Sequence, residues 1–211
     1  MRFLLIAMLV AGQAGSVKFS PARALKTFLP ISQPAQAIGG GEVLVELLVD
    51  QQGIVRDVQT LRATPPFTPL VLDAVRTWNF APATIANPNE QPRAMESSVL
   101  VAGVFRPPAI YNQPGLGDQP KDLKKPSARV PFPTKIGMPA YPPQALFDGI
   151  VLVEVGVTPT GTVSEAKIIG AGSGFEQVSL EAVRAWQFTP TKTPSYVYVI
   201  FGFRQPVIVN P

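Results

Sequence analysis

The chain of 211 residues contains no cysteine and no histidine. These absences exclude thiol nucleophiles, Ser-His triads, disulfides and most zinc or transition-metal sites. Charged residues make up only 15% of the sequence, the formal net charge is +4, and no dense basic run is present. We therefore expect no metal, no cofactor and no nucleic-acid partner.

The N-terminus has the layout of an export signal. Arg2 precedes an apolar run over 3–11, and small residues follow over 12–16. We assign residues 1–16 to a signal peptide, with cleavage after Ala14. As a helix the run spans about 14 Å, well short of the roughly 30 Å hydrocarbon core of a bilayer. Cleaved export is therefore favoured; a membrane anchor and a buried N-terminal helix are the alternatives.

The chain contains an internal repeat with a constant offset of 108 residues. Residues 33–82 align with 141–190 without a gap, and 20 of the 50 positions are identical. A repeat of this length indicates two copies of one small domain rather than a solenoid. We assign 28–108 to the first copy, 109–135 to a linker containing proline and lysine, and 136–211 to the second copy.

Each copy shows the order β-β-α-β, which predicts an α+β fold: two tandem small domains, each an antiparallel sheet with one main helix on one face. Alternating apolar residues and turn sequences predict strands over 42–49, 54–61 and 99–106, and over 150–157, 162–169 and 196–204. Helices are expected from Thr68 to a stop at Pro82 and over 176–186, with helical turns over 34–38 and 142–147. We predict a polar loop over 83–98 and no firm element over 17–33.

The apolar residues of these elements predict the core. Within each helix they recur at helical spacing, and along the first strands the valines share one face. A tryptophan follows Ala-Val-Arg in both copies, where helix and sheet meet, and packing is its expected role. The predicted core consists of Trp78, Phe80, Val151, Val153, Val155, Val183, Trp186 and Phe188.

The second copy resembles the C-terminal domain of TonB. The resemblance rests on Tyr-Pro-Pro-Gln-Ala at 141–145, Gly149 followed by alternating valines, Gly-Thr-Val at 161–163, Ala-Val-Arg-Ala-Trp-Gln-Phe-Thr-Pro at 182–190 and Phe-Gly-Phe at 201–203. It covers essentially all of the second copy. The first copy matches more weakly, because Gln33 replaces the tyrosine and two glycines replace Phe147 and Asp148.

The resemblance implies a periplasmic protein that takes part in energy-coupled transport. Family members capture an extended segment of an outer-membrane transporter as a strand beside their last β-strand, where main-chain groups supply affinity. The expected pairing edges are 196–203 and, in the first copy, 98–105. By this analogy the partner-binding residues of the last strand are Tyr196, Val197, Tyr198, Val199, Ile200, Phe201 and Phe203. We add Arg184, on the helix, as a contact for an acidic partner.

Two departures from the family weaken the expectation of force transmission. Energy coupling in the family needs an uncleaved transmembrane helix, and the apolar run 3–11 is short for one. It also needs a long proline-rich spacer before the domain, and here the first copy occupies that region. An inner-membrane anchor is the alternative location. An envelope scaffold that self-associates through sheet edges or binds peptidoglycan is the alternative function.

Catalysis has little support in the sequence. Glu46 and Glu154 recur at equivalent strand positions, facing away from the valines, and we expect both to be solvated. Arg76 and Arg184 recur on the helices, where exposure is expected. No partner acid or metal cluster can be placed beside either glutamate, so we expect that the protein is not an enzyme.

Overall fold

The structure is a computed structural model that describes residues 16–29, 33, 39–106, 125–142, 145, 147–170 and 174–205. The predicted signal peptide, the helical turn over 34–38, part of the turn over 142–147 and most of the linker lie outside these residues. The mixed α+β class is confirmed: strands dominate, and the described chain has two helices. These are α1 (Phe67–Val75) and α2 (Glu176–Arg184).

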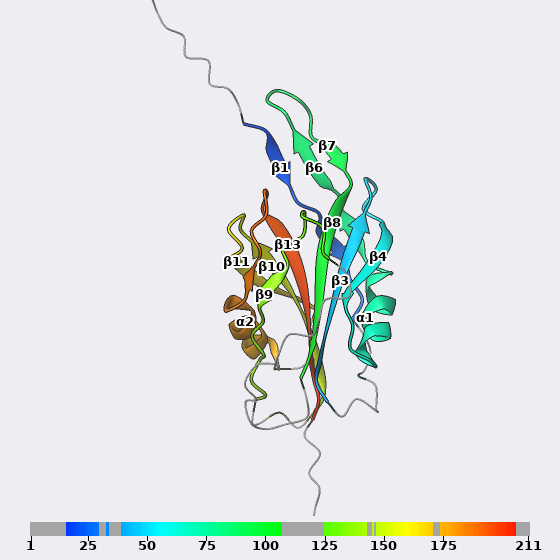
Figure 1. Cartoon of the computed structure of the whole chain (residues 1–211), viewed down its shortest axis with the longest axis vertical. Coiled ribbons are helices and arrows are strands. Elements are labelled where there is room, and N and C mark those ends of the chain that lie inside the picture. The colour runs from blue at the N-terminus through cyan, green and yellow to red at the C-terminus, as the bar shows by residue number, and fades with distance from the viewer. Residues whose placement is uncertain are drawn as a thin grey trace, which may run out of the picture.

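One six-stranded sheet forms the centre of the molecule, in the order β11-β10-β13-β8-β3-β4 (Figure 1). Its strands are β3 (Gly41–Val49), β4 (Val55–Arg62), β8 (Ser97–Phe105), β10 (Gly149–Val157), β11 (Val163–Gly170) and β13 (Ser195–Phe203). We call residues 41–105 the N-terminal half and 149–203 the C-terminal half. Both halves have the predicted order β-β-α-β, and each strand lies within two residues of its predicted bounds.

The two halves pair their strands in equivalent registers. Gly41 lies opposite Phe105 in one half and Gly149 opposite Phe203 in the other. The offset between the halves is thus 108 residues at the first strands and 98 at the last. The extra residues of the N-terminal half form a hairpin, β6 (Ala83–Ala86) and β7 (Arg93–Met95), where a loop was predicted.

A seam joins the halves. Strands β8 and β13 pair in parallel, from Leu100 opposite Val197 to Phe105 opposite Gly202. The prediction of two separate antiparallel sheets is therefore wrong. The predicted open edge is also wrong over 197–202 and 100–105, which pair with each other, whereas residues 98, 99 and 196 lie before this parallel ladder. Both last strands are apolar on both faces, which is typical of a central strand and unsuited to a sheet edge. Pairing them satisfies their main-chain groups and buries both faces.

The helices cover opposite faces of this sheet (Figure 1). Each face also buries side chains from the half that does not supply its helix. The α1 face takes Leu152, Tyr198 and Ile200 from the C-terminal half. The α2 face takes Leu44, Leu100, Ala102 and Val104 from the N-terminal half. The halves therefore share both cores and do not form two independent domains.

Two further segments, 16–29 and 125–142, are attached to the halves by short strands outside the sheet, and we call them the covering segments. Strand β1 (Lys18–Ser20) pairs with β6, β2 (Arg23–Lys26) with β5 (Asn79–Ala81), and β9 (Pro133–Lys135) with β12 (Gln187–Phe188). No element was predicted over 17–33, because strands of three or four residues are too short to show an alternating pattern.

Helix α1 ends at Val75, well before Pro82, so the predicted stop was wrong. Thr77 Oγ1 donates to Ala74 O at 2.7 Å, and Phe80 N donates to Gly53 O at 2.9 Å, which draws the chain into β5. Both tryptophans follow their helices and bond to covering segments: Trp78 Nε1 donates to Phe28 O and Trp186 Nε1 to Gly137 O. All eight side chains predicted for the core are buried.

Candidate functional site at the seam

The residues predicted to bind a partner lie in the centre of the sheet. Strand β13 pairs with β10 on one side and β8 on the other, so its ladder has no open edge from Val197 to Gly202. Six of the predicted side chains are buried: Val197, Val199, Phe201 and Phe203 in the α2 core, and Tyr198 and Ile200 in the α1 core. Only Tyr196, before the parallel ladder, is partly exposed.

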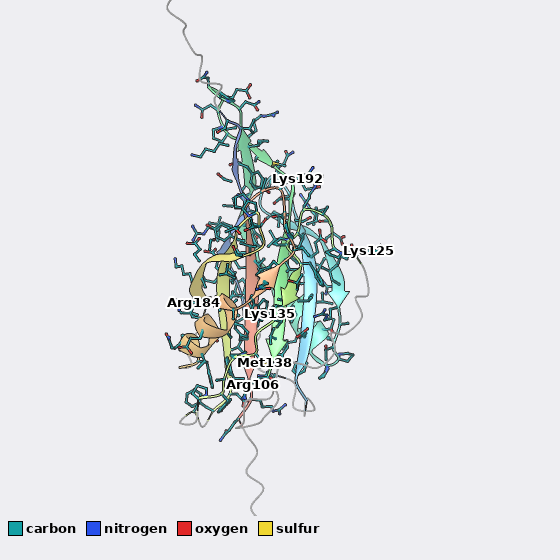
Figure 2. All side chains as sticks on the ribbon, turned by 60° about the vertical axis from the view of Figure 1, so that its left-hand side comes forward. Arg106, Lys125, Lys135, Met138, Arg184 and Lys192 are labelled. Carbon is teal, nitrogen blue, oxygen red and sulfur yellow. The ribbon has the colours of Figure 1, made fainter. Side chains whose placement is uncertain are left out.

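Arg184 lies apart from these residues. Its side chain is exposed in the last turn of α2, and Figure 2 shows it well separated from Lys192 at the upper end of the sheet. The strand residues that were grouped with it are buried, apart from the half-buried Tyr196, so Arg184 does not share a surface with them.

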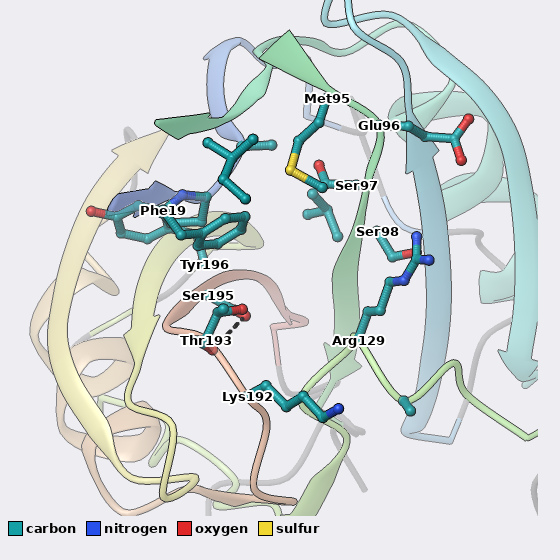
Figure 3. Close-up of a pocket in the computed structure, with 15 residues that line it drawn as sticks. Phe19, Met95, Glu96, Ser97, Ser98, Arg129, Lys192, Thr193, Ser195 and Tyr196 are labelled. Atoms are coloured by element: carbon teal, nitrogen blue, oxygen red, sulfur yellow. Dashed lines mark hydrogen bonds between the residues drawn. The ribbon is translucent and has the colours of Figure 1, made fainter. Parts of the chain in front are cut away.

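A cavity of about 450 Å³ opens where β8 and β13 begin (Figure 3). Ser97, Ser98 and Val99 pair with β3, and Ser195 and Tyr196 pair with β10. The described ladder between the two strands starts only at Leu100 and Val197. The facing sides of these strand ends therefore diverge around the cavity. We call this cavity the seam cavity; sequence reasoning missed it because it depends on the pairing of the halves.

Its two walls differ in chemistry. Side chains alternate along a strand, so Val99 and Tyr196 point to the α1 face, while Ser98 and Ser195 point to the α2 face. The apolar wall consists of Phe19, Ala22, Ile85, Met95, Val99 and Tyr196. The polar wall consists of Ser98, Arg129, Lys192, Thr193 and Ser195. Figure 3 shows Phe19, Met95 and Tyr196 gathered apart from Arg129 and Lys192.

The charge of the lining is positive. Arg129 and Lys192 are exposed and form no ion pair with a described residue, and Glu96 is the single acid among the described lining residues. Burial raises the pKa of Tyr196 above its usual value, so its phenol stays neutral at physiological pH. Ser97 Oγ is buried and has no hydrogen-bond partner among the described residues. The cavity can therefore accept an anion and a further hydrogen-bonding group.

The two repeated glutamates are buried, which corrects the expectation that they are solvated. Glu154 is 3% exposed and accepts three bonds from Arg23, at 2.7 to 3.1 Å, and one from Tyr198 OH at 3.2 Å. Glu46 is 8% exposed and accepts a bond from Ser127 N at 2.9 Å. Covering segments from distant parts of the sequence bury both, and the strand pattern carried no sign of them.

These bonds tie each covering segment to the opposite half. Arg23 lies on β2, which pairs with the N-terminal half, yet its partner Glu154 lies on β10. The bond to Glu154 raises the pKa of Arg23, and burial raises the pKa of Tyr198. Ala24 N also donates to Tyr198 OH at 2.6 Å. The glutamates are thus structural anchors of the seam.

Residues 138–204 match the family model of the Gram-negative bacterial TonB protein C-terminal. The C-terminal half thus carries the TonB likeness. The match spans β10, β11, α2 and β13, and it does not extend to the N-terminal half. No curated protein matches the sequence at a significant level.

The matched TonB family takes part in transport energy coupling, is envelope-associated and interacts with outer-membrane proteins. Within the described residues no group of acidic side chains could hold a metal ion. None of the helices in the described ranges has the length and apolar character needed to cross a membrane.

Proposed function

We propose that this chain is a periplasmic TonB-like protein that binds segments of outer-membrane transporters by strand addition, as part of energy-coupled transport. The family match over 138–204 carries the proposal. We propose no catalytic role, because Glu46 and Glu154 are both engaged in structural bonds.

Strand addition needs main-chain groups that are not already paired. The β8–β13 pairing occupies the edge that the resemblance implied. In the described sheet three places remain: the outer sides of β11 and β4, and the diverging ends at the seam cavity. Strand β11 carries the exposed charges Glu165 and Lys167 and a register shift, features that discourage indiscriminate edge pairing.

The test is a titration of isotope-labelled full chain with peptides from the periplasmic N-termini of candidate transporters. We expect chemical-shift changes at one of the three open places, while amides 197–202 remain protected from exchange. The same peptides with alternate N-methylated residues are the control, since they cannot form a ladder. Peptides that leave all three places unchanged would reject binding by strand addition.

The export part of the proposal has its own test. Mass spectrometry of the protein from cells should find the N-terminus after residue 14, in a periplasmic fraction. An intact Met1 in the membrane fraction would replace this proposal with an inner-membrane anchor.

The two outer edges also favour a second candidate, an envelope scaffold. The described sheet ends in β11 and β4, and either strand can pair with another copy of the chain. Light scattering without ligand separates the candidates: the scaffold should be oligomeric at micromolar concentration, and the transporter-binding protein monomeric.

A further inference from the structure

We propose that the seam cavity binds an extended peptide segment in which apolar and acidic side chains alternate. The inference rests on the proposed function for its choice of a protein partner. It adds the place of binding, which is the seam cavity rather than an outer edge of the sheet. It also adds the chemistry of the partner.

The main chain supplies the first argument. On one side of the cavity Ser97, Ser98 and Val99 pair with β3 alone, and on the other side Ser195 and Tyr196 pair with β10 alone. Strand residues direct N–H and C=O groups to both sides, so the facing sides hold donors and acceptors that the described ladders do not use. An extended segment that enters along the seam continues the sheet between β8 and β13.

The side chains supply the second argument. A segment in that position directs successive side chains to opposite faces of the sheet. Those on the α1 face meet the apolar wall, including Phe19, Met95 and Val99. Those on the α2 face meet hydroxyl groups together with Arg129 and Lys192, and these two cations outnumber Glu96, the one acid among the described lining residues. Charge complementarity selects acidic residues at these positions and apolar residues between them.

The size and lining of the cavity favour a short peptide over other anions. A volume of about 450 Å³ falls in the range of small-ligand sites, roughly 300–1,000 Å³, so a few residues enter rather than a folded domain. A fatty carboxylate would suit the apolar wall and the two cations equally well. It would leave the facing main-chain groups of Ser98, Val99 and Tyr196 without partners, which is why we argue for the peptide.

The experiment measures binding of acetyl-Val-Asp-Val-Asp-Val-amide to the full chain by calorimetry, with shift mapping to locate it. Acetyl-Val-Lys-Val-Lys-Val-amide tests charge, and acetyl-Val-Val-Val-Asp-Asp-amide tests alternation. We expect only the alternating acidic peptide to bind, with shifts at 97–99 and 195–196. Binding of decanoate with no binding of this peptide would overturn the proposal, as would equal binding of all three peptides or none.

Charge reversal gives the sharper test. Arg129→Glu combined with Lys192→Glu changes two exposed side chains and should leave the unfolding midpoint unchanged. We expect the acidic peptide to lose about tenfold or more in affinity and the lysine peptide to gain binding. The control, Arg76→Glu with Lys135→Glu, makes the same change in net charge at exposed sites elsewhere, and it also breaks the exposed ion pair between Arg76 and Asp73. Equal loss in both double variants would mean a non-specific charge effect and would overturn the proposal.

The outcomes separate this inference from the proposed function. If transporter peptides bind at β11 or β4 and ignore the Arg129 and Lys192 reversal, the proposed function stands and the seam cavity is not its site. If the alternating peptide binds in the cavity while no transporter segment binds anywhere, the cavity stands and the transport role fails.

Discussion

Arg23 and Glu154, 131 residues apart in sequence, form an ion pair in which Arg23 Nη2 donates to Glu154 Oε1 at 2.7 Å. The pair joins the N-terminal segment to a strand of the C-terminal half, beneath the ring of Tyr196, whose centroid lies 5.1 Å from the guanidinium. The segment is therefore part of the fold, and its attachment also sets one wall of the seam cavity through Phe19 and Ala22.

Removing this cation should destabilise the whole chain. Arg23→Gln leaves the Glu154 carboxylate, 4% exposed in its side chain, with fewer donors. We expect a loss of about 1–3 kcal/mol in the free energy of unfolding, as for bonds to charged groups, toward the lower end because the Arg23 side chain is 48% exposed. Denaturant unfolding measures it. Arg56→Gln is the control, since the Arg56 side chain is 62% exposed and such pairs contribute under about 1 kcal/mol; equal losses would contradict the role of Arg23.

Trp186→Ala should cost about 3–5 kcal/mol, the usual range for deletion of a buried aromatic side chain. Trp186 is 2% exposed and packs edge-on against Phe201, and its Nε1 donates a hydrogen bond to Gly137 O. Trp186→Phe, which keeps an aromatic ring but loses the hydrogen bond, should cost less. Thermal and denaturant unfolding report both; an unchanged midpoint in Trp186→Ala would place the side chain outside the core.

Gly161 and Gly53 occupy equivalent turns that admit only glycine. Gly161 has φ +85° and Gly53 φ +81°, and a Cβ atom at Gly161 would lie 2.0 Å from Phe188 O. We expect Gly161→Ala to lower the free energy of unfolding by about 1–3 kcal/mol, which is the effect of the strained backbone alone. Gly39→Ala is the matched control, because no atom lies within 4 Å of its added Cβ. Similar midpoints for the two variants would show that the turn relaxes.

Asp50 should make the fold sensitive to acid. The hydrogen bond from Ile54 N, supported by Arg56 and Gln52 N, holds the pKa of Asp50 below its usual value. As pH falls, the Asp50 carboxylate is protonated in the unfolded chain first, near pH 4. Its stabilising effect is therefore present above that pH and is lost as pH falls toward its pKa in the folded chain. Asp50→Asn should be less stable than the parent at pH 7, with the difference shrinking below about pH 4. A difference independent of pH would contradict this.

Arg184→Ala should weaken partner binding more than folding. The side chain is exposed on α2, so its loss should change the free energy of unfolding by less than about 0.5 kcal/mol. If Arg184 contacts an acidic partner, the titration with transporter peptides should weaken severalfold. Arg76→Ala, at the equivalent place beyond α1, is the control. Equal effects on binding and folding would remove Arg184 from the partner surface.

The sequence by itself determined the repeat, the order of strands and helix in each half, the apolar faces, and the two glycine turns. These features are local: a period of two, a helical spacing and a Gly turn act within a few residues. Even the burial of β13 on both faces is indicated by its run of apolar residues at 196–203, whereas the resemblance to TonB implies an open sheet edge there.

Tertiary structure alone decided which strand edges pair and which polar groups become buried. The parallel seam forms because two doubly apolar last strands satisfy each other's main chain and place α1 and α2 on opposite faces. Glu46 and Glu154 are buried because Ser127 and Arg23 reach them from covering segments far away in the chain. Contacts at such separations leave no periodic trace in either partner's sequence, so the seam, its anchors and its cavity emerge only from the folded chain.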